Sequence, residues 1–158
     1  MGRITDILRT MDYGPSPESA EHVRAWLAAH RGGFGHFIGG RFTAPGALFD
    51  VDNPATGERI ARVSQGAGED VDAAIASARK ALGKWGALSG DQRARHLYAL
   101  ARHVQKRDRF LAVLESVDNG KPIRESRDID IPLVARHFYH HAGWASLISS
   151  EFPGYRPV

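Results

Sequence analysis

The feature that most constrains the fold is an imbalance between helical and strand patterns. From residue 68 onward, apolar residues recur at helical spacing, as in residues 71–82, 97–104 and 134–145. Strand patterns occur only within residues 36–63. Because strands do not alternate with helices, the chain contains no complete parallel βαβ fold, and its helical stripes have little sheet to cover. The pattern therefore predicts part of an α/β fold and a poorly cooperative fold for this chain alone.

The predicted β region is short and interrupted by turns. Apolar runs indicate three strands, near residues 36–43, 47–52 and 58–63. In the turn between the second and third, Pro54 presets φ, Asn53 can bond its own backbone and Gly57 tolerates positive φ. Such strands would form at most a small antiparallel sheet.

Capping residues mark the starts of the predicted helices. Ser16 and Pro17 suit the start of a helix that should stop at residues 31–33. Ser89 and Gln92, three residues apart, form the pattern of a capping box.

Two more boundaries are predicted further along the chain. Gly120 followed by Pro122 is typical of a helix end. The last helix should then start near Asp128 or Asp130, with Pro132 tolerated in its first turn.

Composition excludes several classes of function. The chain has 158 residues and no cysteine, so it contains no disulfide, thiolate metal site or cysteine nucleophile. The net charge of +3 comes from well-mixed acids and bases, so we expect no nucleic-acid partner. Weak, salt-dependent nucleic-acid binding remains an alternative. No apolar run approaches the roughly 20 residues that span a bilayer, so we expect no membrane partner and a cytoplasmic protein.

Motifs for independent chemistry are weak. Residues 32–35 lack the GxGxxG spacing of a phosphate loop, and no GxSxG elbow is present. His137, His140 and His141 can share one helical face, but zinc needs ligands that converge in a tetrahedron. We therefore interpret them as exposed helix histidines in preference to a zinc site.

Five segments, taken in order, resemble the aldehyde dehydrogenase superfamily. They are residues 37–42, 49–58, 69–85, 114–122 and 138–145. The most specific is residues 114–122, LESVDNGKP. Residues 12–19 and 25–27 also resemble the start of the family-16 aldehyde dehydrogenases, which are long and carry a second dehydrogenase-like domain.

The resemblance implies an α/β fold class. The chain would be the N-terminal part of the aldehyde dehydrogenase fold, short antiparallel strands plus packing helices, truncated before the Rossmann-type parallel sheet. Residues 1–35 would be an N-terminal helical extension. Residues 36–158 would be an incomplete N-terminal segment of the NAD-binding domain.

The resemblance also implies a function for the complete enzyme, oxidation of aldehydes to carboxylic acids with NAD or NADP. The family uses a cysteine nucleophile, a glutamate base and an asparagine that holds the oxyanion. Their motifs lie beyond Val158, so no catalytic or cofactor-binding residue is assigned here, and we expect this chain alone to bind no cofactor and to be inactive. The alternative is a non-enzymatic interaction module derived from the same fold. The reading frame after Val158 would discriminate the two.

One non-catalytic site follows from the resemblance. Some members bind a structural monovalent cation through the aspartate of the DNGKP motif and carbonyl groups just before Asn-Pro. Here these are Asp118 and the backbones of Val51 and Asp52, oxygen ligands that suit a hard cation. A role for Asp118 as a helix C-terminal turn residue is the alternative.

The connection after the last helix is shorter than in typical members. Only residues 145–158 are available where others form an oligomerisation hairpin. The usual tetramer interface is therefore not expected, which leaves a homodimer of the complete enzyme as the possible assembly.

Overall fold

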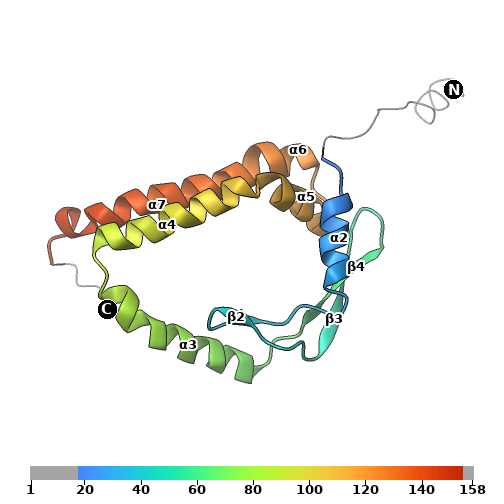
Figure 1. Cartoon of the computed structure of the whole chain (residues 1–158), viewed down its shortest axis with the longest axis horizontal. Helices are drawn as coiled ribbons and strands as arrows, with labels where there is room; N and C mark the ends of the chain where they lie inside the picture. The colour runs from blue at the N-terminus through green and yellow to red at the C-terminus, as the bar shows by residue number, and fades with distance from the viewer. Residues whose placement is uncertain (1–17, 155–158) are drawn as a thin grey trace, which may run out of the picture.

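The computed structural model describes residues 18–154 (Figure 1). The Ser16–Pro17 cap, most of the family-16-like residues 12–19 and the last four residues lie outside this range. In chain order the elements are α2 (Glu21–Ala29), β1 (Phe37–Ile38), β2 (Arg41–Phe42), β3 (Leu48–Asp52), β4 (Arg59–Ser64), α3 (Gly68–Gly86), α4 (Gly90–Lys106), α5 (Asp108–Asn119), α6 (Ile123–Glu125), the π-helical turn η1 (Ser126–Asp130) and α7 (Ile131–Glu151).

The prediction of a single strand at residues 36–43 is wrong, because this segment folds back on itself as two short strands. Strands β1 and β2 pair antiparallel, with Phe37 opposite Phe42. Between them Gly39 and Gly40 take φ of 65° and 82°, a conformation that glycine adopts without steric cost. The two phenylalanine rings then pack edge to face, with centroids 5.1 Å apart.

The other two strands form a second antiparallel pair, close to the predicted ranges. The turn between these two strands has the hydrogen bonds and the positive φ that its residue types predicted. The Asn53 side-chain Oδ1 accepts from the Ala55 amide at 2.9 Å, and the Gly57 amide donates to the Asn53 carbonyl at 2.7 Å with φ of 72°. Residues 18–154 thus contain two separate two-stranded sheets, where the sequence suggested a single small one.

The predicted caps of α4 and α5 are confirmed, whereas the helix expected to start at Ser16 and Pro17 begins only at Glu21. The Gln92 amide donates to Ser89 Oγ at 3.2 Å, and the Ser89 amide donates to Gln92 Oε1 at 2.8 Å, which confirms the capping box of α4. Helix α5 is followed by Gly120 in the left-handed conformation, and Pro132 lies in the first turn of α7. The segment α6–η1 was not predicted, since a single turn leaves no apolar period to detect.

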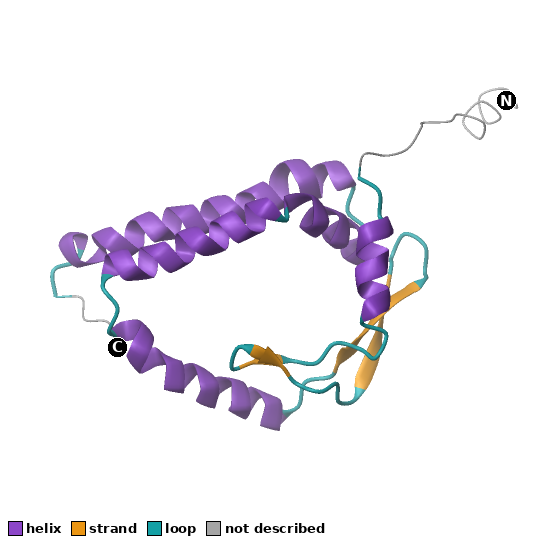
Figure 2. Cartoon of the chain, viewed as in Figure 1, coloured by secondary structure: helices purple, strands orange, loops and turns teal. Residues whose placement is uncertain are grey.

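Helices α4 and α7 lie side by side and antiparallel along one side of the molecule (Figure 2). Their contact uses small residues, since Ala94, Ala101, Ala135 and Ala142 are all buried. At one end of the pair, a Cβ added to Gly90 would lie 2.2 Å from the carbonyl oxygen of Ala145. The two backbones therefore approach more closely than larger side chains would permit.

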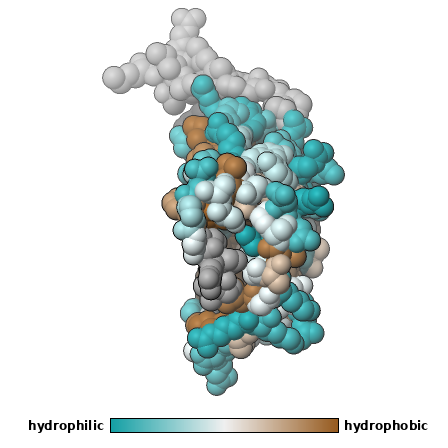
Figure 3. All heavy atoms as spheres, turned by 90° about the vertical axis from the view of Figure 1, so that its left-hand side faces the viewer, coloured by the Kyte–Doolittle hydropathy of each residue, from teal (hydrophilic) through white to brown (hydrophobic). Residues whose placement is uncertain are grey.

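The buried apolar core is small. Among the described residues its members are five alanines and two valines: Val23, Ala94, Ala101, Ala112, Val113, Ala135 and Ala142. The large exposed apolar side chains are Trp26, Phe37, Phe42, Phe49, Val71, Ile75, Leu82, Trp85, Tyr98, Leu100, Ile129, Leu133, Val134, Trp144, Leu147 and Phe152. Figure 3 shows apolar residues at the surface among the polar ones. The helices therefore present apolar surface that this chain does not cover.

Helix α3 lies opposite the α4–α7 pair, and the strands and α2 lie at one end between them (Figure 1). Helix α2 contacts β4 and α5, and an isolated bridge pairs Phe34 with Val63. Within residues 18–154, no helix combines the length and the apolar character needed to cross a membrane.

The close approach of α4 and α7 can be tested by substituting alanine for a glycine at the contact and for one outside it. Gly90→Ala should reduce the helical circular dichroism signal, because its methyl group meets the Ala145 carbonyl, and such overpacking costs about 1–3 kcal/mol. Gly83→Ala in α3 is the matched control, since no atom lies within 4 Å of its added Cβ. It should keep or raise the signal, by helix propensity worth about 1 kcal/mol. Equal signals from the two variants would contradict the packing.

Candidate functional site

The three residues of the expected cation site lie at the ends of two elements. Asp118 is the next-to-last residue of α5 and is exposed. Val51 is half-buried and Asp52 exposed at the end of β3, where the pairing with β4 shifts register between them. A register shift of this kind frees backbone groups from the regular ladder.

The structure brings these two segments together. A Cβ added to Gly120 would lie 2.8 Å from Pro54 Cγ, so the end of α5 contacts the turn that follows β3. Val117 and Asn53 also line the same pocket. The chain neighbours of Asp118 thus contact the chain neighbours of Asp52, while coordination of a cation by Asp118, Val51 and Asp52 stays a prediction.

A charged network that the sequence analysis missed lies just beyond Asp118. Lys121 Nζ is hydrogen-bonded to the Asp130 carboxylate and lies 3.5 Å from Glu115 Oε1. The hydrogen bond that Lys121 donates to Asp130 raises the pKa of Lys121. Glu115 and Lys121 both belong to the family-like segment, but their partner in η1 could not be inferred from spacing.

The same network contains a buried polar contact between α5 and η1. Ser126 is fully buried, and its Oγ lies 3.2 Å from Ser116 Oγ. The second carboxylate oxygen of Glu115, Oε2, is buried without a hydrogen-bond partner. Such a network fixes the end of α5 against the start of α7, so its clearest role is positional.

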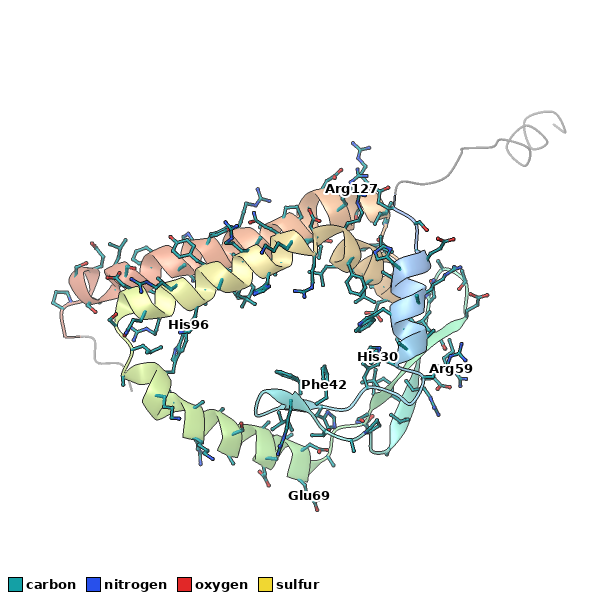
Figure 4. All side chains as sticks on the ribbon, viewed as in Figure 1. His30, Phe42, Arg59, Glu69, His96 and Arg127 are labelled. Atoms are coloured by element: carbon teal, nitrogen blue, oxygen red, sulfur yellow. The ribbon has the colours of Figure 1, made fainter. Side chains whose placement is uncertain are left out.

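The carboxylates of Asp128 and Asp130 have separate partners. Asp128 Oδ1 accepts from Arg127 Nε at 2.7 Å, which lowers the pKa of Asp128. Arg127 Nη1 also donates to Glu18 Oε1 at 2.7 Å, and Figure 4 shows Arg127 at the α6 end of the molecule. These two aspartates therefore form ion pairs near the start of α7 and do not act as a carboxylate pair.

The histidines of α7 are exposed; His137 and His141 stack, whereas His140 and His141 meet edge to face. The rings of His137 and His141 have centroids 6.5 Å apart, and those of His140 and His141 are 5.3 Å apart. Within the part of the chain that the structure describes, no group of three histidine, cysteine, aspartate or glutamate residues could hold a metal ion. That finding does not bear on the Asp118 site, which would use backbone carbonyl groups.

A comparison with family models matches residues 42–156, more than half of the chain, to the aldehyde dehydrogenase family. DhaS, an aldehyde dehydrogenase homologue from Bacillus subtilis (strain 168), is 42% identical over 119 residues. That match covers 73% of this chain and 24% of DhaS. The chain thus spans about a quarter of the length of this relative.

Solved structures of the family superpose on the chain. HpcC from Thermus thermophilus matches with a TM-score of 0.75 and 30% identity, over 84% of this chain and 26% of that one. The aldehyde dehydrogenase from Bacillus cereus, solved as an NAD+ complex, matches with a TM-score of 0.71 and 33% identity, over 85% and 27%. The predicted fold class, short antiparallel strands and packing helices of part of this fold, is confirmed.

The expected cation site gives a second test. Unfolding by urea is followed in potassium chloride or sodium chloride and, at equal ionic strength, in tetramethylammonium chloride, whose cation is too large for such a site. The small cations should raise the urea concentration at which half of the helical circular dichroism signal is lost, because they bind the folded chain. Asp118→Asn should abolish the difference, whereas Asp72→Asn, an exposed control in α3, should keep it. A difference that survives in Asp118→Asn would refute the site.

Proposed function

The chain belongs to the aldehyde dehydrogenase family, and from that premise we propose that it is the N-terminal segment of an NAD(P)-dependent aldehyde dehydrogenase. The complete enzyme oxidises aldehydes to carboxylic acids with catalytic and cofactor residues from outside this chain. This proposal rests on the comparison with DhaS, in which 73% of the chain matches only 24% of the length of DhaS. The chain also has no cysteine to act as nucleophile.

The function of this segment in the proposed enzyme is to build the framework around the NAD-binding sheet. Its large apolar side chains face outward from α3, α4 and α7, as in Ile75, Leu100 and Leu147. Burying one such side chain contributes about 1.5–3 kcal/mol. A parallel sheet packed on these stripes would therefore supply the stability that the small alanine-lined core lacks.

Cofactor and substrate follow from the relatives. The Bacillus cereus enzyme is solved with NAD+, and AldC from Pseudomonas syringae, as a C291A mutant, with NAD+ and octanal. The proposed enzyme accordingly takes NAD or NADP and an aldehyde. The resemblance of residues 12–19 supports a family-16 enzyme.

The exposed apolar stripes also suit a second candidate, a non-enzymatic interaction module that uses the same surface to bind another protein. The two candidates differ in what the stripes cover. In an enzyme they pack on the enzyme's own sheet, and activity depends on that packing.

A chimera tests the proposal. The N-terminal segment of DhaS that matches this chain is replaced by this chain's residues, and aldehyde-dependent formation of NADH is measured. We expect activity within about tenfold of DhaS, equal to about 1.4 kcal/mol of the barrier, because the segment supplies framework and not reacting groups.

Two controls accompany the chimera. DhaS without the segment and the 158-residue chain alone should both be inactive. A soluble, folded chimera without activity would contradict the framework role and favour the interaction module. NADH formation by the chain alone would contradict the assignment of catalytic residues to the rest of the enzyme.

A further inference from the structure

A basic pocket lies where α2 meets β4 and the turn after β3. It encloses about 520 Å³. Its charged and titratable lining residues are Arg24, His30, Arg31, Glu58, Arg59 and Arg62. Figure 4 shows His30 and Arg59 at the end of α2 that adjoins β4. The volume falls in the range of roughly 300–1,000 Å³ typical of small-molecule sites.

The positive charge of this pocket is only partly neutralised. Arg59 Nη1 lies 3.3 Å from Asp50 Oδ2, an exposed ion pair. Arg62 Nη2 donates to the Arg31 carbonyl at 3.1 Å, a bond that holds its guanidinium without cancelling its charge. Within residues 18–154, neither Arg24 nor Arg31 takes part in an ion pair. Four arginines and one carboxylate, that of Glu58, thus line the pocket, and Asp50 pairs with Arg59 from outside the lining.

We propose that this pocket binds the phosphate groups of a phosphorylated small molecule. The planar guanidinium fork matches phosphate oxygens in a bidentate manner, and charge-assisted bonds of this kind are among the strongest hydrogen bonds in proteins. Arginines from two elements, Arg24 on α2 and Arg62 on β4, line one concavity.

The pocket is independent of the proposed catalytic function. One wall comes from α2, which precedes the matched residues 42–156, and the other from β4, within them. The site therefore combines the N-terminal extension with the family framework. Its concave shape favours a small molecule over a nucleic acid, which needs an extended basic stripe.

The test is a calorimetric titration of the full chain with inorganic pyrophosphate at low ionic strength. Arg24→Gln with Arg31→Gln should weaken binding by about tenfold or more, since each removes an unpaired guanidinium. The control is Arg95→Gln with Arg102→Gln, exposed residues of α4 that carry the same charge outside the pocket. Glu58→Gln should strengthen binding, because it removes a facing carboxylate.

Circular dichroism checks that the variants keep the helical content of the parent. If the double variant loses helix, Arg31→Gln alone replaces it, because Arg31 follows the end of α2 and should weaken binding severalfold without disturbing that helix. Failure of pyrophosphate to bind, or equal losses in the pocket and control double variants, would overturn the proposal.

Further ligands define the chemistry. ADP should bind with an affinity similar to that of pyrophosphate, and its binding should fall in the pocket variant alone. Equal binding of citrate would overturn the assignment to phosphate. An oligonucleotide that binds more tightly than pyrophosphate and weakens equally in both double variants would show that general surface charge, and not this pocket, is responsible.

Discussion

The close contact between α4 and α7 determines which side chains of these two helices are buried and which stay exposed. Alanines and Gly90 line much of it, so the two backbones approach closely. Tyr98 and Tyr139 also meet across it, with ring centroids 5.6 Å apart. Other large apolar residues of both helices lie outside the contact, and Leu100 on α4 and Leu147 on α7 are about half exposed. A helix pair built in this way has an interior, but it leaves much of its potential hydrophobic stabilisation on its outer surface.

Local chemistry made part of this fold predictable. The capping box of Ser89 and Gln92, the turn at Asn53 and the glycine after α5 each depend on residues close in sequence, and each was predicted. The β1–β2 hairpin was not, because the glycine pair could mark a bend within a strand or a reversal. The sequence shows more apolar helix faces than strands for them to cover, and this imbalance correctly indicated that the chain holds little sheet.

The site was less predictable than the fold, because it depends on contacts between distant segments. The pairing of the Asp118 region with the turn after β3 came from the family resemblance, and spacing alone could not have supplied it. Lys121 meets Asp130 at the end of η1, a π-helical turn that the apolar pattern did not indicate. The basic pocket was missed for the same reason, since Arg24 and Arg62 lie on elements far apart in the sequence.

The central claim is that this chain is a framework whose helices require a sheet from outside it. Differential scanning calorimetry of the pure 158-residue chain tests this most directly. For the chain alone we expect a broad unfolding transition whose calorimetric enthalpy falls well below the roughly 0.7 kcal/mol per residue of complete globular domains. We also expect that the van't Hoff and calorimetric enthalpies disagree. A sharp two-state transition of a monomer with the full enthalpy would contradict the account.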